Sequence, residues 1–471
     1  MVIPWALVLW HWSFLLLAAF CGRAFAASPP PNLVIFLADD QGVLDCSPYG
    51  AKDVRTPNLQ HLADAGLTFD RAFVASPSCA PSRAALLTGL MPARNGAEAN
   101  HSKPRPELKK LPAFLKELGY EVAAFGKVSH YRHTADYGFD HFAHDSFHDP
   151  AAIPSALKWL RERSSPKPLC LFVGSNWPHV PWPENPEGYE AAKLTPPPAH
   201  VDTSVTRETR ARYYAAVTRM DAELGQVREL AREKLGANTA FFSTSDHGAQ
   251  WPFGKWNCYD AGVRVPLVVE WAGVIKPGAR TDAMVSWVDL LPTLIELAGG
   301  QPPDLDGRSF AGVLRGKAAT HRNEIFTTHS GDGKFNVYPI RSVRTAQWKY
   351  IQNLHPEFQH ATHINRAARR DGLDYWLSWQ QAAQTDPHAA AILKRYAERP
   401  REELYDLAAD PHELRNLAAD PPHTERARAM RERLEAWMDE QGDKRTVFNE
   451  PLLLGQEATP LPAGAPKPSP K

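Results

Sequence analysis

Acidic side chains stand directly after two short apolar runs of the sequence. Asp39 and Asp40 follow the first run, and Asp246 follows a later one with His247 beside it. Converging carboxylates repel one another unless a cation lies among them. Carboxylate oxygens carried on loops suit a hard divalent ion and favour Ca²⁺ over Mg²⁺, whereas a histidine nitrogen is more typical of softer metals.

Basic side chains follow two other apolar runs. Lys127 and His130 come after one of them, and His179 comes after the next. Each candidate taken alone has an ordinary explanation as a cap, a turn, or a surface or core histidine. We interpret their shared placement as functional, because all of these explanations would have to hold together to remove the site.

A cysteine and an arginine mark the start of a predicted helix. Residues 81–88 are typical of a helix, with Pro81 in its first turn and Gly89 after its end. Cys79 lies where backbone N–H groups and the helix dipole stabilise an anion. Arg83, about one turn further on, can point back to the same place. The alternative interpretation is a buried structural cysteine.

The elements that position these residues are short, continuous apolar runs, as expected for strands covered on both faces. Helical patterns alternate with the runs, which predicts an α/β protein with a large, doubly wound, mainly parallel sheet flanked by helices. Ligands bind such sheets outside the carboxyl ends of the strands, where the candidates stand. The runs cover residues 33–37, 121–125, 169–173, 239–242 and 266–269, and the main helical stripe runs from Tyr213 to Val227 with Gly236 as its stop.

The pattern changes after about residue 335. Residues 340–350 are typical of paired strands and 362–399 of helices, and 425–441 predicts an amphipathic helix with Thr424 as its N-cap. These features predict a smaller α+β C-terminal domain. We divide the chain into a signal peptide over 1–26, a catalytic α/β domain over 27–335, the C-terminal α+β domain over 336–450, and a disordered, Pro-rich tail over 451–471.

The N-terminal segment predicts secretion. Residues 2–20 are almost wholly apolar, and Ala24-Phe25-Ala26 fits a cleavage pattern of small residues. A secreted or periplasmic protein with no stable membrane contact follows from cleavage there. No Lys or Arg precedes the apolar run, so an uncleaved membrane anchor is the alternative. Lys plus Arg equals Asp plus Glu, at 53 each, so no global charge favours nucleic acid.

The segment from Ser78 to Gly89, with Cys79-Ala80-Pro81-Ser82-Arg83 followed by Ala-Ala-Leu-Leu-Thr-Gly, resembles the signature of the sulfatase family. These formylglycine-dependent enzymes belong to the alkaline phosphatase superfamily, and their signature cysteine is oxidised to formylglycine, an aldehyde. The resemblance covers most of residues 32–420. Further similar motifs are Asn32 to Gly42, Thr56 to Leu59, Gly126 to His130, Ser245 to Gly248, and Gly254-Lys255.

The resemblance implies a role for each candidate. One Ca²⁺ would be held by Asp39, Asp40, Cys79, Asp246 and His247. Cys79 would be the nucleophile, assisted by Arg83, and Lys127 and Lys255 would hold the sulfate oxygens. His179 would be the acid for the leaving group, with His130 as its partner or as the base on the formylglycine hydroxyl. The spacing from Lys127 to His130 is one residue longer than the family's commoner form, and His247 replaces a frequent Asn.

Residues 245–262, with Pro252-Phe253-Gly254-Lys255-Trp256-Asn257, are similar to the heparan N-sulfatase and iduronate-2-sulfatase-like branch. This implies a sulfated saccharide as substrate, with heparan-type glycans favoured, and a formylglycine-generating maturation enzyme as partner. One alternative is a phosphomonoester or phosphonate-ester hydrolase of the same superfamily. Another is a non-catalytic glycan-binding homologue, which predicts loss of Cys79, the carboxylates or the lysines; none is lost.

Overall fold

The computed structural model describes residues 29–143, 148–367, 370–458 and 461. The predicted signal peptide therefore lies outside the described residues, and so do residues 459–460 and 462–471 of the predicted tail. Among the helices that are described, none is long and apolar enough to cross a membrane.

A mixed sheet forms the centre of the fold, with eight strands among the described residues in the order β10-β2-β9-β7-β1-β6-β4-β5. The neighbours β7, β1, β6 and β4 are parallel, which confirms the predicted mainly parallel sheet. The fifth predicted strand, β9, runs antiparallel to β7. The strands are β1 (Asn32–Ala38), β2 (Leu67–Phe69), β4 (Glu121–Gly126), β5 (His141–Ala143), β6 (Leu169–Gly174), β7 (Thr239–Ser245), β9 (Leu267–Trp271) and β10 (Ala279–Thr281).

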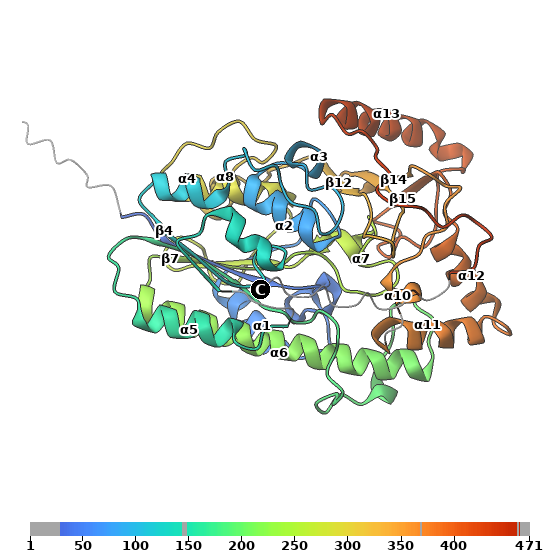
Figure 1. Cartoon of the computed structure of the whole chain (residues 1–471), viewed down its shortest axis with the longest axis horizontal. Coiled ribbons are helices and arrows are strands. Elements are labelled where there is room, and N and C mark those ends of the chain that lie inside the picture. Colours follow the sequence, from blue (N-terminus) through green and yellow to red (C-terminus); the bar gives the residue numbers. More distant parts are fainter. Residues whose placement is uncertain (1–28, 144–147, 368–369, 459–460, 462–471) are drawn as a thin grey trace, which may run out of the picture.

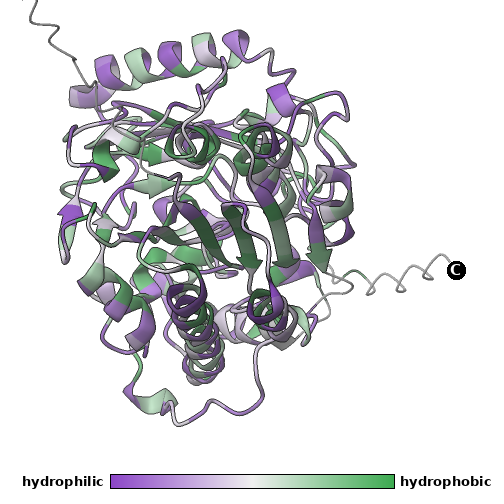
Figure 2. Ribbon diagram, turned by 90° about the vertical axis from the view of Figure 1, so that its left-hand side faces the viewer, coloured by the Kyte–Doolittle hydropathy of each residue, from purple (hydrophilic) through white to green (hydrophobic). Residues whose placement is uncertain are grey.

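Helices cover both faces of the sheet, because the side chains of β1 alternate between two apolar cores. Leu33 and Ile35 belong to one core, and Val34 and Phe36 to the other. Figure 1 shows α2, α4 and α8 on one side of the sheet and α1, α5 and α6 on the other, and Figure 2 shows hydrophobic strands between these layers. The helices are α1 (Pro57–Ala65), α2 (Cys79–Thr88), α4 (Leu111–Glu117), α5 (Ala152–Glu162), α6 (Ser204–Leu235) and α8 (Leu290–Leu297).

The strand register brings the candidate residues to one edge of the sheet. Ala38 pairs with Ser245, so Asp39 and Asp246 leave the sheet side by side. Gly126 pairs with Gly174 at the ends of β4 and β6. The carboxyl ends of four parallel strands therefore open at the same place, as the sequence predicts.

A second, antiparallel sheet has the order β12-β13-β14-β15, and α13 packs against its middle strands. Its first strand precedes residue 336, so this sheet begins before the predicted domain boundary. The elements of this part are β12 (Ile325–His329), β13 (Ile340–Arg344), β14 (Trp348–Asn353), α10 (His363–Arg366), α11 (Arg370–Ala382), α12 (Pro387–Ala397), β15 (Glu402–Asp406) and α13 (Thr424–Glu440). Shorter elements are β3 (Ala72–Phe73), α3 (Pro92–Asn95), α7 (Asp260–Val263), β8 (Arg264–Val265), β11 (Val285–Ser286) and α9 (Ala311–Leu314).

The structure differs from the sequence-based expectation at two local points. Thr424 is the first residue of α13 rather than its N-cap, and its hydroxyl donates to the carbonyl oxygen of Pro421 at 3.1 Å. The predicted disordered tail begins as ordered chain, because the carbonyl oxygen of Leu452 accepts from the N–H of Gln359 at 2.7 Å. A Pro-rich composition does not reveal whether the backbone of a segment pairs with another part of the chain.

Gly126 ends β4 just before Lys127, in the left-handed region at φ +72°, and a Cβ there would lie 2.1 Å from the carbonyl oxygen of Gly174. We expect Gly126→Ala to lower the free energy of unfolding by about 2–5 kcal/mol, because overpacking adds to the left-handed backbone cost. Gly119→Ala is the matched control, since Gly119 has φ +85° and open space around its Cβ; it should lose only about 1–2 kcal/mol. Urea denaturation measures both, and equal losses would contradict the steric argument.

Candidate active site

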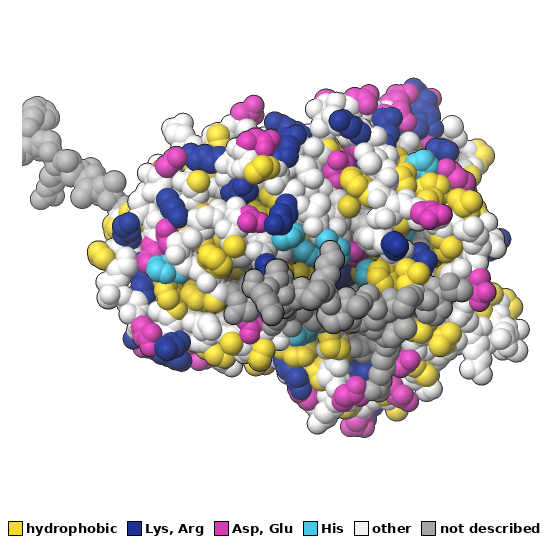
Figure 3. Space-filling model, in the orientation of Figure 1, with side chains coloured by type: hydrophobic (Ala, Val, Ile, Leu, Met, Phe, Trp, Pro, Cys, Tyr) yellow, Lys and Arg dark blue, Asp and Glu magenta, His cyan; other side chains and the backbone are white. Residues whose placement is uncertain are grey.

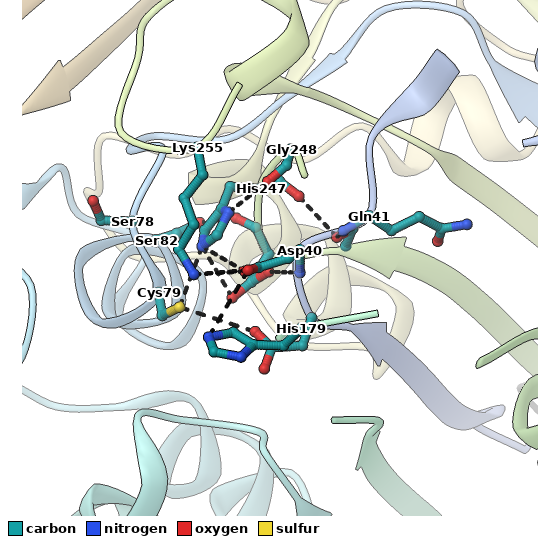
Figure 4. Close-up of polar contacts among 12 residues, drawn as sticks. Asp40, Gln41, Ser78, Cys79, Ser82, His179, His247, Gly248 and Lys255 are labelled. Carbon is teal, nitrogen blue, oxygen red and sulfur yellow. Dashed lines mark hydrogen bonds and ion pairs between the residues drawn. The ribbon is translucent and has the colours of Figure 1, made fainter. Parts of the chain in front are cut away.

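The predicted residues meet beside the first turn of α2. Figure 4 shows Cys79, Asp40, His179, His247 and Lys255 pointing toward one another from different elements. Asp39, Asp246, Arg83 and Lys127 join them, and every member of this set is buried. Charged groups at this depth require partners, because burial without them is costly.

Asp39 lies between two cations. Its Oδ1 accepts from the Nη2 of Arg83 at 3.1 Å, and its Oδ2 lies 2.5 Å from the Nζ of Lys127. Burial alone would raise the pKa of Asp39, but Lys127, His179 and Arg83 outweigh burial and hold the pKa well below its usual range. Asp39 is therefore a fixed negative charge.

Arg83 joins the ends of three strands to α2. Its Nε donates to Asp246 Oδ2 at 2.9 Å, its Nη2 donates to Asp39, and its Nη1 donates to the backbone carbonyl of Lys127. All three nitrogens of the guanidinium therefore have protein acceptors. Arg83 orients the carboxylates rather than offering free donors to a ligand.

Asp40 has a different balance of charges. The Nζ of Lys255 lies 3.0 and 2.7 Å from its two carboxylate oxygens. Burial raises the pKa of Asp40, and the carboxylates of Asp39 and Asp246 raise it further, against the opposite effects of Lys255 and His247. The pKa of Asp40 is raised overall, so this position favours further positive charge.

The thiol of Cys79 touches both the acidic and the basic residues. Its Sγ lies 3.3 Å from the Nε2 of His247, 3.6 Å from the Nζ of Lys127 and 3.9 Å from Asp39 Oδ1. Burial raises the pKa of this thiol far above its usual value, despite Lys127 and Lys255. An unmodified Cys79 is a neutral thiol at physiological pH and hence a poor nucleophile.

Asp40, Cys79, Asp246 and His247 can hold a metal ion, because their ligand atoms all lie within 4.8 Å of one another. The Nδ1 of His247 lies 2.9 Å from the carbonyl oxygen of Gly248, an arrangement that leaves Nε2 to face the carboxylates. Two carboxylates and one imidazole fit a divalent cation. Asp39, the fifth predicted ligand, lies outside this group, and its two oxygen atoms face Arg83 and Lys127.

The two predicted catalytic histidines occupy different environments. The Nε2 of His179 lies 3.8 Å from Asp40 Oδ2, and its Nδ1 lies 2.6 Å from the carbonyl oxygen of Val180. His130 instead hydrogen-bonds His101, with 2.7 Å between Nε2 and Nδ1, and packs against the ring of Tyr131. The structure therefore brings His179 to the carboxylates and places His130 farther out.

Sequence reasoning missed several residues around the site. Asn100 accepts from the backbone N–H of Ala80 at 3.0 Å, and the ring of Tyr131 lies over the Nζ of Lys127 at 4.8 Å. Asp40, His101, Tyr131 and Trp256 all have left-handed backbone conformations, with φ of 68°, 67°, 53° and 66°. Such strain is typical of functional sites, but no sequence pattern of this chain announces it.

The site places two lysine ammonium groups and the N-terminal turn of α2 near Cys79, an arrangement that suits a compact oxyanion. Residues 31–300 match the sequence profile described as Sulfatase, and residues 247–362 match the one described as N-sulphoglucosamine sulphohydrolase, C-terminal. Because the first match spans more than half of the 471 residues, the chain belongs to the sulfatase family. It is a sulfuric ester hydrolase, which confirms the predicted enzyme class.

Two relatives match along most of their length. An ulvan-active sulfatase of Formosa agariphila is 33% identical over 432 residues, which is 89% of this chain and 82% of the relative. Human N-sulphoglucosamine sulphohydrolase is 28% identical, over 88% of this chain and 91% of the relative.

Two solved structures share the fold. A protein in complex with its substrate D-glucosamine-2-N,6-O-disulfate has a TM-score of 0.67 at 19% identity, over 89% of this chain and all of the other. The phosphonate monoester hydrolase of Agrobacterium radiobacter has a TM-score of 0.66 at 19% identity, over 90% of this chain and 99% of the other. At this identity the likeness shows the fold alone.

The role of Arg83 predicts a large effect on stability. We expect Arg83→Met to lower the free energy of unfolding by about 3–5 kcal/mol, because it leaves Asp39 and Asp246 buried without their shared cation. Arg94→Met is the control: Arg94 pairs with Asp306 at 2.7 Å, but its side chain is 41% exposed, so its loss should cost less than about 1 kcal/mol. Denaturation in the presence of a chelator compares the two, and a small loss for Arg83→Met would refute the bridging role.

Proposed function

We propose that the chain hydrolyses sulfate esters or sulfamates of sulfated saccharides, with a formylglycine made from Cys79 and with one bound Ca²⁺. The observation that carries this proposal is the position of Cys79, at the first residue of α2, between the ammonium group of Lys127 and the metal-binding atoms of Asp40, Asp246 and His247. The raised pKa of the thiol supports a nucleophile other than sulfur.

The two groups would supply complementary chemistry. A formylglycine made from Cys79 would supply, in its hydrated form, two hydroxyl groups on one carbon as the nucleophile. Asp40, Asp246 and His247 would hold a Ca²⁺, which would supply positive charge beside that nucleophile.

The residues of this chain would hold the sulfate group and its charge. Lys127 lies 3.6 Å from Cys79 Sγ and offers a donor on one side of the nucleophile. Lys255 binds Asp40 and would offer a second ammonium group to a sulfate oxygen. Donors placed where charge develops are effective because the pocket is buried.

His179 would protonate the leaving group. Burial, Lys255 and Lys127 hold the pKa of His179 well below its usual range, so the imidazole is neutral before substrate binds. A bound sulfate group brings negative charge, which favours the protonated ring. The Nδ1 contact with the carbonyl oxygen of Val180 would hold the Nε2 edge toward the site.

The charge of the pocket supports sulfate over phosphate. Arg83 is occupied by Asp39, Asp246 and a backbone carbonyl, which leaves Lys127 and Lys255 as the ammonium groups next to the nucleophile. A sulfate monoester carries one negative charge, whereas a phosphate monoester carries two near neutral pH. This charge argument disfavours phosphate monoesters; a phosphonate monoester carries one negative charge, as a sulfate monoester does, and is the second candidate.

The comparisons support a saccharide substrate and leave two sugars open. The C-terminal match and the human relative support an N-sulfated glucosamine, and the more similar bacterial relative supports ulvan. The predicted secretory segment is compatible with either polymer, and a maturation enzyme would have to modify Cys79 before use.

The proposal is tested with protein made beside a formylglycine-generating enzyme. We expect mass spectrometry to find an aldehyde at position 79 and sulfate to be released from sulfated saccharides. Cys79→Ala should lower kcat by about 10³-fold or more, as nucleophile loss does in other covalent hydrolases. Phosphate and phosphonate esters of the same alcohols form the comparison panel. A higher kcat/KM on those esters, or activity that survives in Cys79→Ala, would refute the sulfatase mechanism.

Calcium should stabilise the folded protein. After chelation, added Ca²⁺ at about 100 times its Kd should raise the free energy of unfolding by about 2.7 kcal/mol, and Mg²⁺ should do less. Asp40→Asn should abolish this gain because it removes a central ligand. Asp70→Asn, which changes a surface carboxylate paired with Arg280, should keep the gain. Equal stabilisation of both variants would place the ion elsewhere.

A further inference from the structure

A buried carboxylate from the C-terminal part of the chain lies at the margin of the active site. Asp332 follows β12 and is 3% exposed. Its Oδ2 accepts from the Nδ2 of Asn100 at 2.9 Å and from the Nε1 of Trp256 at 2.8 Å, and its Oδ1 lies 3.1 Å from the Nε2 of His101. Trp256 and Asn100 can only donate here, because Asn100 uses its oxygen for the N–H of Ala80.

These contacts determine which nitrogen of His101 carries hydrogen. An ionised Asp332 accepts only, so the Nε2 of His101 must carry the hydrogen that faces it. In the neutral ring the Nδ1 of His101 is then an acceptor, and it lies 2.7 Å from the Nε2 of His130. His130 must donate through that Nε2, which leaves its own Nδ1 without hydrogen.

The remaining nitrogen of His130 is a free acceptor. His130 is 5% exposed, and its Nδ1 is buried without a hydrogen-bond partner among the residues that the structure describes. The ring of Tyr131 packs on His130, with 4.4 Å between the ring centroids, and lies 4.8 Å from the Nζ of Lys127, so Tyr131 links His130 to the lysine that we assign to the sulfate group. A buried acceptor without a partner indicates a place where a ligand completes the hydrogen bonding.

We propose that Asp332 and His101 are positioning residues that hold His130 in the tautomer with a free Nδ1, and that this Nδ1 accepts a hydrogen bond from a hydroxyl group of the bound saccharide. The proposal rests on the proposed function and adds a determinant of substrate choice to it. His101 has a 58% exposed side chain, so this end of the hydrogen-bonded pair is open to solvent. Figure 3 shows histidine side chains near the middle of one face of the molecule.

The substitution Asp332→Asn reverses the direction of these hydrogen bonds and keeps the shape of the side chain. Asn100 and Trp256 require an oxygen at the Oδ2 position, so the amide nitrogen must replace Oδ1 and donate to the Nε2 of His101. That ring would then carry its hydrogen on Nδ1 and donate to His130, whose Nδ1 would become a donor. Histidine ¹⁵N NMR of the metal-loaded protein distinguishes the tautomers, and we expect both rings to switch. Unchanged tautomers would overturn the proposal without reference to activity.

Kinetics separate this role from a structural one. Asp332→Asn should lower kcat/KM on a sulfated saccharide about tenfold, the usual size for one neutral hydrogen bond, mainly through KM. On p-nitrophenyl sulfate, which has no sugar hydroxyl, kcat/KM should stay within about twofold of wild type. Equal losses on both substrates would overturn the proposal, whereas an inactive wild type would refute the sulfatase function instead.

Two further variants keep the test independent of folding. His101→Ala removes an exposed side chain, so the protein should fold, and it should show the same selective loss on the saccharide. His133→Gln is the matched control, because His133 contacts the ring of His130 at 5.4 Å without a hydrogen bond to it; it should match wild type on both substrates. A kcat/KM on the saccharide equal to that of wild type in His101→Ala would overturn the proposal.

Discussion

The buried guanidinium of Arg83 is the interaction on which the rest of the site depends. The pairing of Ala38 with Ser245 forces Asp39 and Asp246 to emerge side by side, and two carboxylates so close and so deep repel each other. Arg83 offsets this repulsion by binding both, and its third nitrogen holds the chain after β4. The sheet can therefore deliver acidic residues to one edge only because α2 brings a matching cation to it.

The lysine–carboxylate pairs beyond Arg83 can change partners when ligands bind. Lys127 and Lys255 bind Asp39 and Asp40, so the described cluster contains as many cations as carboxylates. Under the proposed function, a divalent ion at Asp40 would compete with Lys255 and release its ammonium group toward an incoming anion. Metal binding and sulfate binding would then favour each other, because the positive charge of the metal ion and the negative charge of the sulfate group offset each other.

The sequence predicts what depends on local pattern and misses what depends on contacts between loops. Continuous apolar runs reveal the strands, and the residues after them reveal Asp40, His179 and Asp246. Asp39 lies outside the group of four metal-binding atoms and pairs with Arg83 and Lys127, and no spacing rule encodes those pairings. Strand direction is equally hidden, since the apolar run of β9 reads the same in either orientation.

His130 lies apart from the nucleophile, although Lys127 of the same motif contacts it. Lys127 reaches Cys79 directly after β4, whereas Ser129 bonds Thr134, and His130 turns outward to His101. His130 contacts His101, which in turn contacts Asp332 of the C-terminal part of the chain. The site therefore has an inner group of charges around Arg83 and, under our proposal, an outer group in which Asp332 sets the direction of the hydrogen bonds. In both groups the two oxygens of one carboxylate have fixed donors, so the geometry of each is set before a substrate arrives.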